Sequence, residues 1–267
     1  MRPANLKGLE LKRLRHRLVA FTLGSVLGLA LTGAATNPAA AQNTLEKIKK
    51  SGEMTIGTSA SYAPFEYHEG SNIVGFDIDL GTEIAKRMGV KINWVEIDFK
   101  GIVAALKSQR VDLLITALTK TPERAEQIAF SIPYFDAGIG AAKPKGSPIA
   151  KPEDLKGRVV GVQIGTSGER FVRDNVKDVK EIKTYDTILL ALKDLEIGRL
   201  DAVVNPLPSI KYNLRGLKGL EVTPVWESSV VGINARKEDT ALMDEINEHL
   251  ANLKKEGFLD RLDRKWF

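Results

Sequence analysis

The sequence contains no cysteine, which excludes disulfide bonds, thiolate metal ligands and a lipid-modified cysteine after a leader. Histidine is scarce as well: only His16, His68 and His249 occur, and the last two stand among polar residues. Three scattered histidines without cysteine show no spacing typical of a metal site or a catalytic triad. We therefore expect no bound metal, no other cofactor and no catalytic residues.

The chain also lacks a strong excess of charge once its N-terminus is set aside. It has 39 Lys and Arg against 34 Asp and Glu. Residues 1–41 hold six of the basic residues and one of the acids, so removing them leaves 33 of each. A neutral remainder gives no reason to expect nucleic acid or an anionic membrane surface as a partner.

The first 41 residues have the layout of a secretory signal peptide. Basic residues between Arg2 and Arg17 precede an uncharged run from Leu18 to Ala35, and small residues, Ala39 to Ala41, follow. This order predicts export to the periplasm with cleavage near Ala41. An uncleaved membrane anchor is the alternative, because the run is nearly long enough to span a bilayer.

After Gln42, strand and helix patterns alternate in two series, which indicates an α/β fold with parallel sheets covered on both faces. The expected strands cover 54–59, 92–97, 112–117, 158–164, 180–185 and 201–205, and the expected helices cover 77–88, 101–108 and 188–197. Two further helices begin at Thr121-Pro122 and at Thr166, where Glu169 completes a capping box.

A segment rich in Pro, Gly and Lys, 133–148, separates the two series. The late strand 230–236 and the amphipathic helix 240–255 have no series of their own, so we expect them to return to the first half. This predicts two lobes, 42–136 with 229–267 and 137–228, joined by two chain crossings that form a hinge. Small ligands bind in clefts between such lobes, at the carboxyl ends of strands.

Two helix starts, one in each expected lobe, offer groups that suit a carboxylate. Arg124 lies in the first turn of a helix after Thr119 and Thr121, and Thr166 with Ser167 opens a helix in the other lobe. A planar guanidinium and free backbone N–H groups are what a carboxylate needs. We expect both groups to face the cleft, with a solvated charge and ordinary capping as the structural alternatives.

Six motifs follow one another at spacings typical of one protein family. They are IGTSASYAPFE at 56–66, VGFDIDL at 74–80, LTKTPER at 118–124, FSIPY at 130–134, VGVQIGTS at 160–167 and GRLDAVV at 198–204. With them the chain resembles the bacterial extracellular solute-binding proteins of the polar amino acid uptake family over nearly all of residues 45–267. The resemblance implies a type II periplasmic-binding-protein fold, closure on an amino acid or close analogue, and a monomer that delivers it to the membrane permease of an ABC transporter.

The resemblance also implies which residues bind the ligand. Tyr62 and Phe99 match rings that enclose the ligand side chain, with core packing as their alternative role. The segment 116–119 matches backbone and hydroxyl groups that meet the ammonium and carboxylate, while Gln163 and Asn205 match variable positions that read the side chain. The expected ligand-binding residues are Ser59, Tyr62, Phe99, Thr116, Ala117, Thr119, Arg124, Gln163, Thr166, Ser167, Asn205 and Pro206.

Two positions depart from the family pattern. Ser59 stands where relatives that bind cationic side chains carry Asp, which argues against lysine, arginine or ornithine. Pro206 stands where the family usually has the Asp that neutralises the ligand ammonium. An ammonium in a closed cleft without a counter-charge is costly. Another acid supplies the charge, the ligand binds weakly, or the ligand has no ammonium.

Three functions therefore stay open at this stage. The first is a transport receptor for a polar or neutral amino acid. The second is a receptor of the same fold for a carboxylate that lacks the α-amino group. The third is a periplasmic enzyme similar to cyclohexadienyl dehydratases, which would need a proton donor over the substrate. No carboxylate stands at Pro206 to serve as that donor, so we expect a binding protein and not an enzyme.

Overall fold

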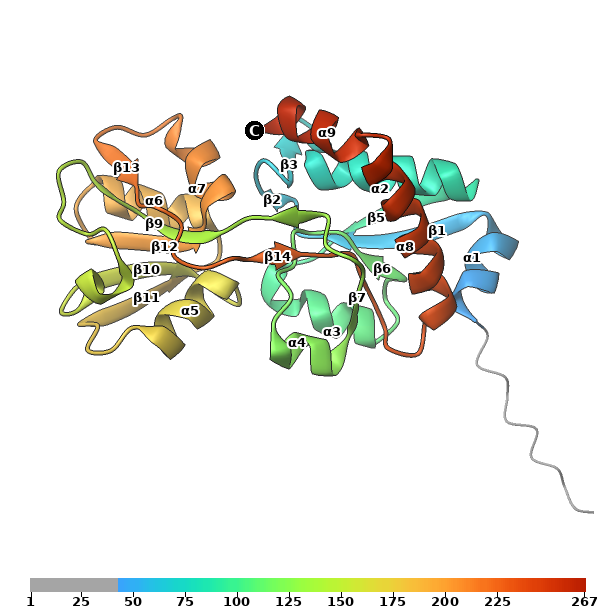
Figure 1. Cartoon of the computed structure of the whole chain (residues 1–267), viewed down its shortest axis with the longest axis horizontal. Coiled ribbons are helices and arrows are strands. Elements are labelled where there is room, and N and C mark those ends of the chain that lie inside the picture. The colour runs from blue at the N-terminus through green and yellow to red at the C-terminus, as the bar shows by residue number, and fades with distance from the viewer. Residues whose placement is uncertain (1–42) are drawn as a thin grey trace, which may run out of the picture. The chain divides into compact units, whose positions relative to one another are not determined.

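The computed structural model describes residues 43–267, so the expected signal peptide lies outside the described residues. Two five-stranded sheets with helices on both sides form the two lobes (Figure 1). Both sheets are mixed, whereas parallel sheets were predicted. The strand that enters each lobe directly after a chain crossing, 139–144 in one and 234–235 in the other, runs antiparallel to its neighbours. No helix within 43–267 is long and apolar enough to cross a membrane.

The first sheet combines early strands with one late strand, as the sequence predicted. In sheet order its strands are β5 (Lys91–Glu96), β1 (Glu53–Thr58), β6 (Leu113–Leu114), β15 (Asn234–Ala235) and β7 (Ala129–Phe130). A three-stranded sheet extends beside it, made of β2 (Ser61–Tyr62), β3 (Glu66–Glu69) and β4 (Asn72–Val74). The helices of this lobe are α1 (Thr44–Ser51), α2 (Phe76–Met88), α3 (Ile102–Lys107), α4 (Pro122–Gln127), α8 (Thr240–Lys255) and α9 (Phe258–Trp266), with a 3-10 turn at Phe99–Gly101.

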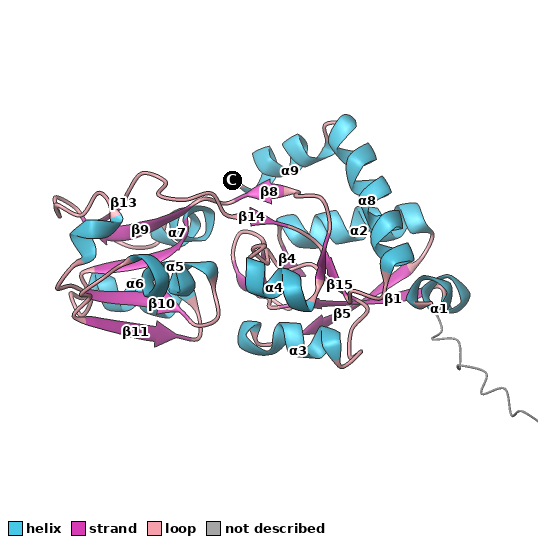
Figure 2. Ribbon diagram, turned by 60° about the horizontal axis from the view of Figure 1, so that its bottom comes forward, coloured by secondary structure: helices cyan, strands magenta, loops and turns pink. Residues whose placement is uncertain are grey.

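The second sheet belongs to the middle of the chain. In sheet order its strands are β11 (Glu181–Tyr185), β10 (Val159–Gln163), β12 (Ala202–Pro206), β9 (Ile139–Pro144) and β13 (Leu220–Val222). Its helices are α5 (Ser167–Asn175), α6 (Ile188–Glu196) and α7 (Leu207–Leu214), with a 3-10 turn at Pro152–Leu155. Figure 2 shows these helices against both faces of the strands.

Two short antiparallel strands, β8 (Phe135–Asp136) and β14 (Val230–Val231), lie where the chain passes between the sheets. They make the two-strand hinge that the sequence predicted. The expected strand 230–236 is interrupted at Gly232, because its first half pairs with β8 in the hinge and its second half pairs inside the first sheet.

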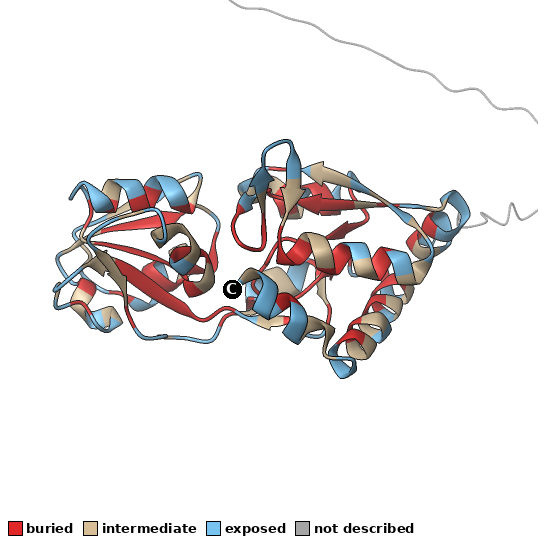
Figure 3. Cartoon of the chain, turned by 90° about the horizontal axis from the view of Figure 1, so that it is seen from above, coloured by how far each residue is buried: buried red, intermediate tan, exposed pale blue. Residues whose placement is uncertain are grey.

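The apolar strand residues provide the cores of both lobes. Met54 and Ile56 of β1 are fully buried, as are Val160 and Val162 of β10. Figure 3 shows buried residues concentrated on the strands and on the helix faces that cover them. These rigid sheets hold the segments that follow their strands, and those segments carry the candidate site.

Candidate functional site

A small cavity lies where the two lobes meet. Residues of the first lobe and of the second line it together: Tyr62, Phe99, Ala117, Thr119, Gln163, Thr166, Ser167 and Pro206. All eight are among the twelve residues expected from the sequence to bind a ligand. The cavity volume is about 10 Å³, close to the space of one water. An amino acid therefore enters only if the lobes separate.

Hydrogen bonds join the two lobes across this cavity. Asn205 Nδ2 donates to Tyr62 Oη at 3.1 Å. The hydroxyl oxygens of Thr119 and Ser167 lie 3.1 Å apart, and Thr119 Oγ1 lies 3.0 Å from Ser229 Oγ of the hinge segment. The structure is thus a closed arrangement in which groups expected to contact a ligand contact one another. Ser229 was not expected from the sequence, since a serine in a loop carries no distinguishing pattern.

Arg124 lies beside the cavity and bonds to both lobes. Its Nη1 donates to the carbonyl oxygen of Thr119 at 2.8 Å, and its Nη2 donates to that of Gly165 at 2.6 Å. The guanidinium carbon is 5.7 Å from the centre of the Phe99 ring. Burial lowers the pKa of Arg124 to about 10, and the nearby Arg170 adds to this, so the side chain stays charged at neutral pH. A cation held here by neutral carbonyls has no carboxylate among its hydrogen-bond partners.

Thr166 and Ser167 begin α5 at the cavity wall. Thr166 Oγ1 accepts from Glu169 N at 3.2 Å, which is the N-cap predicted from the sequence. The second half of the predicted capping box differs, since Glu169 Oε2 accepts from Gly165 N and not from Thr166 N. The backbone of Thr166 instead bonds to Gln163 and closes a turn. The start of α5 therefore brings N–H groups and two hydroxyls to the cavity.

Gln163, at the end of β10, presents an unpaired acceptor. Its Nε2 donates to the carbonyl oxygen of Asp186 at 3.2 Å. A carbonyl can only accept, so this bond fixes the orientation of the amide. Gln163 Oε1 is then left buried and without a partner among residues 43–267. Such an atom favours a ligand group that donates a hydrogen bond.

Asn205 and Pro206 end β12 opposite the first lobe. In the orientation that donates to Tyr62, Asn205 leaves its Oδ1 buried and unpaired among the described residues. Pro206 lines the cavity and supplies neither charge nor N–H. The position where the family usually has an acid is thus an apolar part of the wall.

Ser59 and Thr116 do not line the cavity but lie behind it. Both hydroxyls donate to one carboxyl oxygen, Glu66 Oε1, at 3.0 and 2.7 Å. Beside them Asp77 Oδ2 accepts from Ala117 N at 2.6 Å. Sequence reasoning missed Glu66 and Asp77, although both stand inside the motifs that carry the family resemblance.

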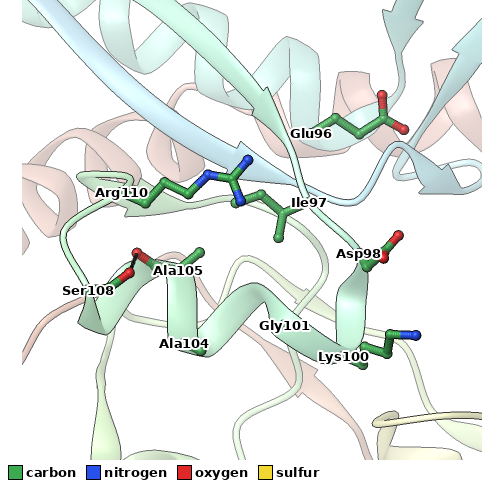
Figure 4. Close-up of a pocket in the computed structure, with 9 residues that line it drawn as sticks. All are labelled: Glu96, Ile97, Asp98, Lys100, Gly101, Ala104, Ala105, Ser108 and Arg110. Atoms are coloured by element: carbon green, nitrogen blue, oxygen red, sulfur yellow. Dashed lines mark hydrogen bonds between the residues drawn. The ribbon is translucent and has the colours of Figure 1, made fainter.

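A larger hollow of about 780 Å³ lies elsewhere, along α3 and the end of β5 (Figure 4). It is lined by Glu96, Ile97, Asp98, Lys100, Gly101, Ala104, Ala105, Ser108 and Arg110. All belong to one lobe, and its shallow opening contains no residue that the sequence singled out. Within the described part of the chain no group of three or more His, Cys, Asp and Glu could hold a metal ion.

Comparisons with known proteins identify the family of the chain. The family described as bacterial extracellular solute-binding proteins, family 3, matches residues 54–267. The L-cystine-binding protein TcyJ of Escherichia coli (strain K12) is 32% identical over 251 residues, which cover 92% of this chain and 94% of that protein. The arginine-binding extracellular protein ArtP of Bacillus subtilis (strain 168) is 34% identical over 220 residues, 80% of this chain and 86% of its own.

A solved structure shows the same fold. The ancestral amino acid-binding protein AncCDT-1, a precursor of cyclohexadienyl dehydratase, matches with a TM-score of 0.78 and 33% identity over 84% of this chain and 99% of its own. The predicted α/β class with two lobes, a cleft and a two-strand hinge is confirmed. The family suggested by the six sequence motifs is confirmed as well.

Proposed function

The chain belongs to the bacterial extracellular solute-binding proteins of family 3, and from this we propose that it captures an amino acid with an uncharged polar side chain between its lobes. It then delivers the amino acid to the membrane permease of an ABC transporter. One observation carries the proposal: Arg124, beside the cavity, bonds to Gly165 just before α5 of the opposite lobe, and Thr166 and Ser167 at the start of α5 line the cavity. Together they suit a carboxylate that would hold the lobes closed.

The twelve residues expected from the sequence form the proposed binding site in three groups. Arg124, Thr119, Thr166 and Ser167 meet the carboxylate. Tyr62 and Phe99 enclose the side chain. Ala117, Gln163, Asn205 and Pro206 surround the ammonium and the polar end of the side chain, and Ser59 and Thr116 support Ala117 from behind the cavity.

An uncharged side chain with N–H or O–H donors fits the second-lobe wall best. The free acceptor Gln163 Oε1 needs such a donor, and no acid stands among the eight lining residues to balance a second positive charge. Ser59 also favours an uncharged side chain over a cationic one. Its hydroxyl carries no charge and already donates to Glu66. Arginine, which the relative ArtP is named for, is therefore not the preferred ligand.

Two alternatives are less well supported. A carboxylate without an α-amino group would suit Pro206, but the relatives carry names of amino acid-binding proteins. A dehydratase activity is suggested only by the description of AncCDT-1 as an enzyme precursor. The cavity lining offers one titratable group, Tyr62, and burial raises its pKa far above neutral. We propose that the chain has no enzymatic activity.

The setting of this function is also proposed. Residues 1–41 act as a signal peptide that is cleaved near Ala41, and the mature protein works in the periplasm as a monomer without nucleic acid. Its lobes are 42–136 with 229–267, and 137–228. Mass spectrometry of the exported protein should give an N-terminus near Gln42, whereas a chain that keeps Met1 in the membrane would contradict cleavage.

The ligand class can be tested with a thermal-shift screen. The refolded protein, freed of any co-purified molecule, is screened with the standard L-amino acids, L-cystine and matched deaminated acids, and hits are titrated by calorimetry. The proposal expects the largest shift from an amino acid with an uncharged polar side chain. Binding of deaminated acids alone, or turnover of prephenate or arogenate, would contradict it.

A further inference from the structure

Two buried carboxyl groups lie beneath the first-lobe side of the cavity. Glu66 is the first residue of β3, and Asp77 stands in the first turn of α2. Neither has any exposed surface. A buried acid without a basic partner is expensive, so the contacts of this pair need an explanation.

Glu66 accepts hydrogen bonds from two residues that lie behind the cavity. Its Oε1 accepts from the hydroxyls of Ser59 and Thr116. Its Oε2 is buried and has no hydrogen-bond donor among residues 43–267. The carboxyl of Asp77 lies close enough that its charge acts on Glu66.

Asp77 accepts a hydrogen bond from Ala117, the residue that follows Thr116. Its Oδ2 accepts from Ala117 N at 2.6 Å and from Tyr134 Oη at 2.9 Å, while its Oδ1 is buried without a partner among the described residues. Ala117 has a left-handed backbone with φ of 45°, and the bond to Asp77 holds it in that conformation. Ala117 lines the cavity, so one peptide unit separates the carboxyl of Asp77 from the cavity.

Two buried carboxyl groups whose charges act on each other cannot both be ionised at low cost, so one of them keeps a proton. Asp77 accepts an N–H and an O–H and lies where the dipole of α2 favours a negative charge, so the proton belongs to Glu66. Burial, with the charge of Asp77, raises the pKa of Glu66, and burial raises that of Asp77 to about 7. The neighbouring Tyr62 and Tyr134 stay neutral, because burial raises their pKa as well.

We infer that the negative charge of Asp77, beside a neutral Glu66, is the counter-charge for the ligand ammonium, in place of the acid that Pro206 cannot supply. The inference rests on the proposed function. The charge acts through the Ala117 peptide, where the buried surroundings screen it weakly. The sequence has no acid at Pro206 to balance a ligand ammonium. Asp77 supplies that acid from the first lobe, behind the residues that line the cavity.

Paired variants separate this charge from the role of the same residues in the fold. Glu66→Gln keeps the acceptor for Ser59 and Thr116 and a donor toward Asp77, and so preserves both the contacts and the charge. Adding Asp77→Asn to Glu66→Gln removes the charge. The oxygen of the new amide at position 77 still accepts from Ala117 N and Tyr134 Oη, and the amide at position 66 turns so that its oxygen accepts from position 77 and its N–H donates to the hydroxyls of Ser59 and Thr116. The single variant is thus the matched control for the double variant.

Each protein is titrated with an amino acid that binds the wild type and with its deaminated counterpart: glutaramate for L-glutamine, dithiodipropionate for L-cystine, guanidinovalerate for L-arginine. We expect Glu66→Gln, which keeps the charge of Asp77, to preserve the wild-type ratio of the two affinities. The double variant should lose about ten-fold in affinity for the amino acid and keep its affinity for the deaminated acid. If the double variant loses affinity equally for both ligands, or loses none, the counter-charge is overturned and the proposed function still stands. A wild type that binds no amino acid overturns the proposed function and the counter-charge with it.

A second measurement needs no variant. An ammonium near Asp77 favours its ionised form, so amino acid binding near neutral pH should release protons from the wild-type protein, and the deaminated acid should not. Calorimetry in two buffers that differ in ionisation enthalpy measures this release. Equal proton release with both ligands overturns the inference even if the double variant fails to fold.

Discussion

Arg124 is the residue where both lobes and the proposed ligand carboxylate converge. Its two nitrogens already reach carbonyl oxygens of Thr119 and Gly165. If a carboxylate takes these donors, Arg124→Ala should weaken binding by about 2–5 kcal/mol. Arg124→Lys should also bind poorly, because an ammonium cannot reproduce the planar fork. Titration calorimetry gives both values.

A suitable control is Arg199→Ala, which removes a cation that pairs only with Asp194 on the surface of the second lobe, among the described residues. That variant should bind as the wild type does, and circular dichroism should show all three variants folded. Unchanged affinity in Arg124→Ala would remove Arg124 from the site.

Pro206 allows a test by gain of function. Its backbone, with φ of −55° and ψ of 129°, is open to Asp as well as Pro, and the residue lines the cavity. Pro206→Asp should therefore shift the preference toward α-amino acids over deaminated acids by about 1–3 kcal/mol, the scale of a hydrogen bond to a charged group. Calorimetry with one matched ligand pair measures the shift. An unchanged preference would mean that a carboxylate at this position does not reach the ammonium.

Among the elements, α5 depends on close packing against β12. A Cβ added at Gly168, in the first turn of α5, would lie 2.7 Å from Val204 O and 2.8 Å from Asn205 Cα. Both are backbone atoms, so the helix start or the strand end must move. Gly168→Ala should lower the free energy of unfolding by about 1–3 kcal/mol and weaken ligand binding, since both sides of the contact belong to the site.

Gly216→Ala is the matched control for this change, because nothing lies within 4 Å of its added Cβ. Urea denaturation should place that variant within about 0.5 kcal/mol of the wild type. Equal effects of the two substitutions would contradict the packing explanation.

The sequence predicted elements well where a local signal exists. The cap at Thr166 and the helix start at Thr121-Pro122 are confirmed, since each depends on neighbouring residues alone. The helix α7 was missed because Pro206 and Pro208 bracket its start and hide its helical pattern. The strand 112–117 pairs only at Leu113–Leu114, because its later residues turn toward the site.

Some site residues could not be predicted from local patterns. Glu66 and Asp77 come from a strand and a helix, and their pairing exists only in the folded lobe. The bond between Tyr62 and Asn205 joins residues 143 positions apart and needs the lobes to close. The eight lining residues were found together because the family resemblance supplied the tertiary information that spacing alone lacks.

At the scale of the whole molecule, the acid pair predicts how stability depends on pH. The pKa of Asp77 is raised from 3.8 to about 7 by burial, and that of Glu66 is raised too. A carboxyl whose folded pKa is raised stabilises the fold at acid pH and loses this contribution as pH rises through the folded value. Between pH about 4 and 7 the wild type should lose stability relative to Glu66→Gln with Asp77→Asn. Urea denaturation at both pH values would contradict this if the two proteins changed in parallel.

The hinge and the cross-lobe contacts predict a change of shape on binding. The contacts at Thr119 and Tyr62 lie on the cavity and that of Arg124 with Gly165 lies beside it, so all three must open to admit a ligand. Small-angle scattering of the refolded protein should show a smaller radius of gyration when a binding amino acid is added. An unchanged radius at saturation would argue against hinge opening in the ligand-free protein.

Native mass spectrometry of the exported protein tests the central claim most directly, because it needs no prior choice of ligand. The wild type should retain one small molecule with the mass of an amino acid that has an uncharged polar side chain, and Arg124→Ala should not. A retained molecule without an amino group, or an amino acid that persists in Arg124→Ala, would contradict amino acid capture at this cavity.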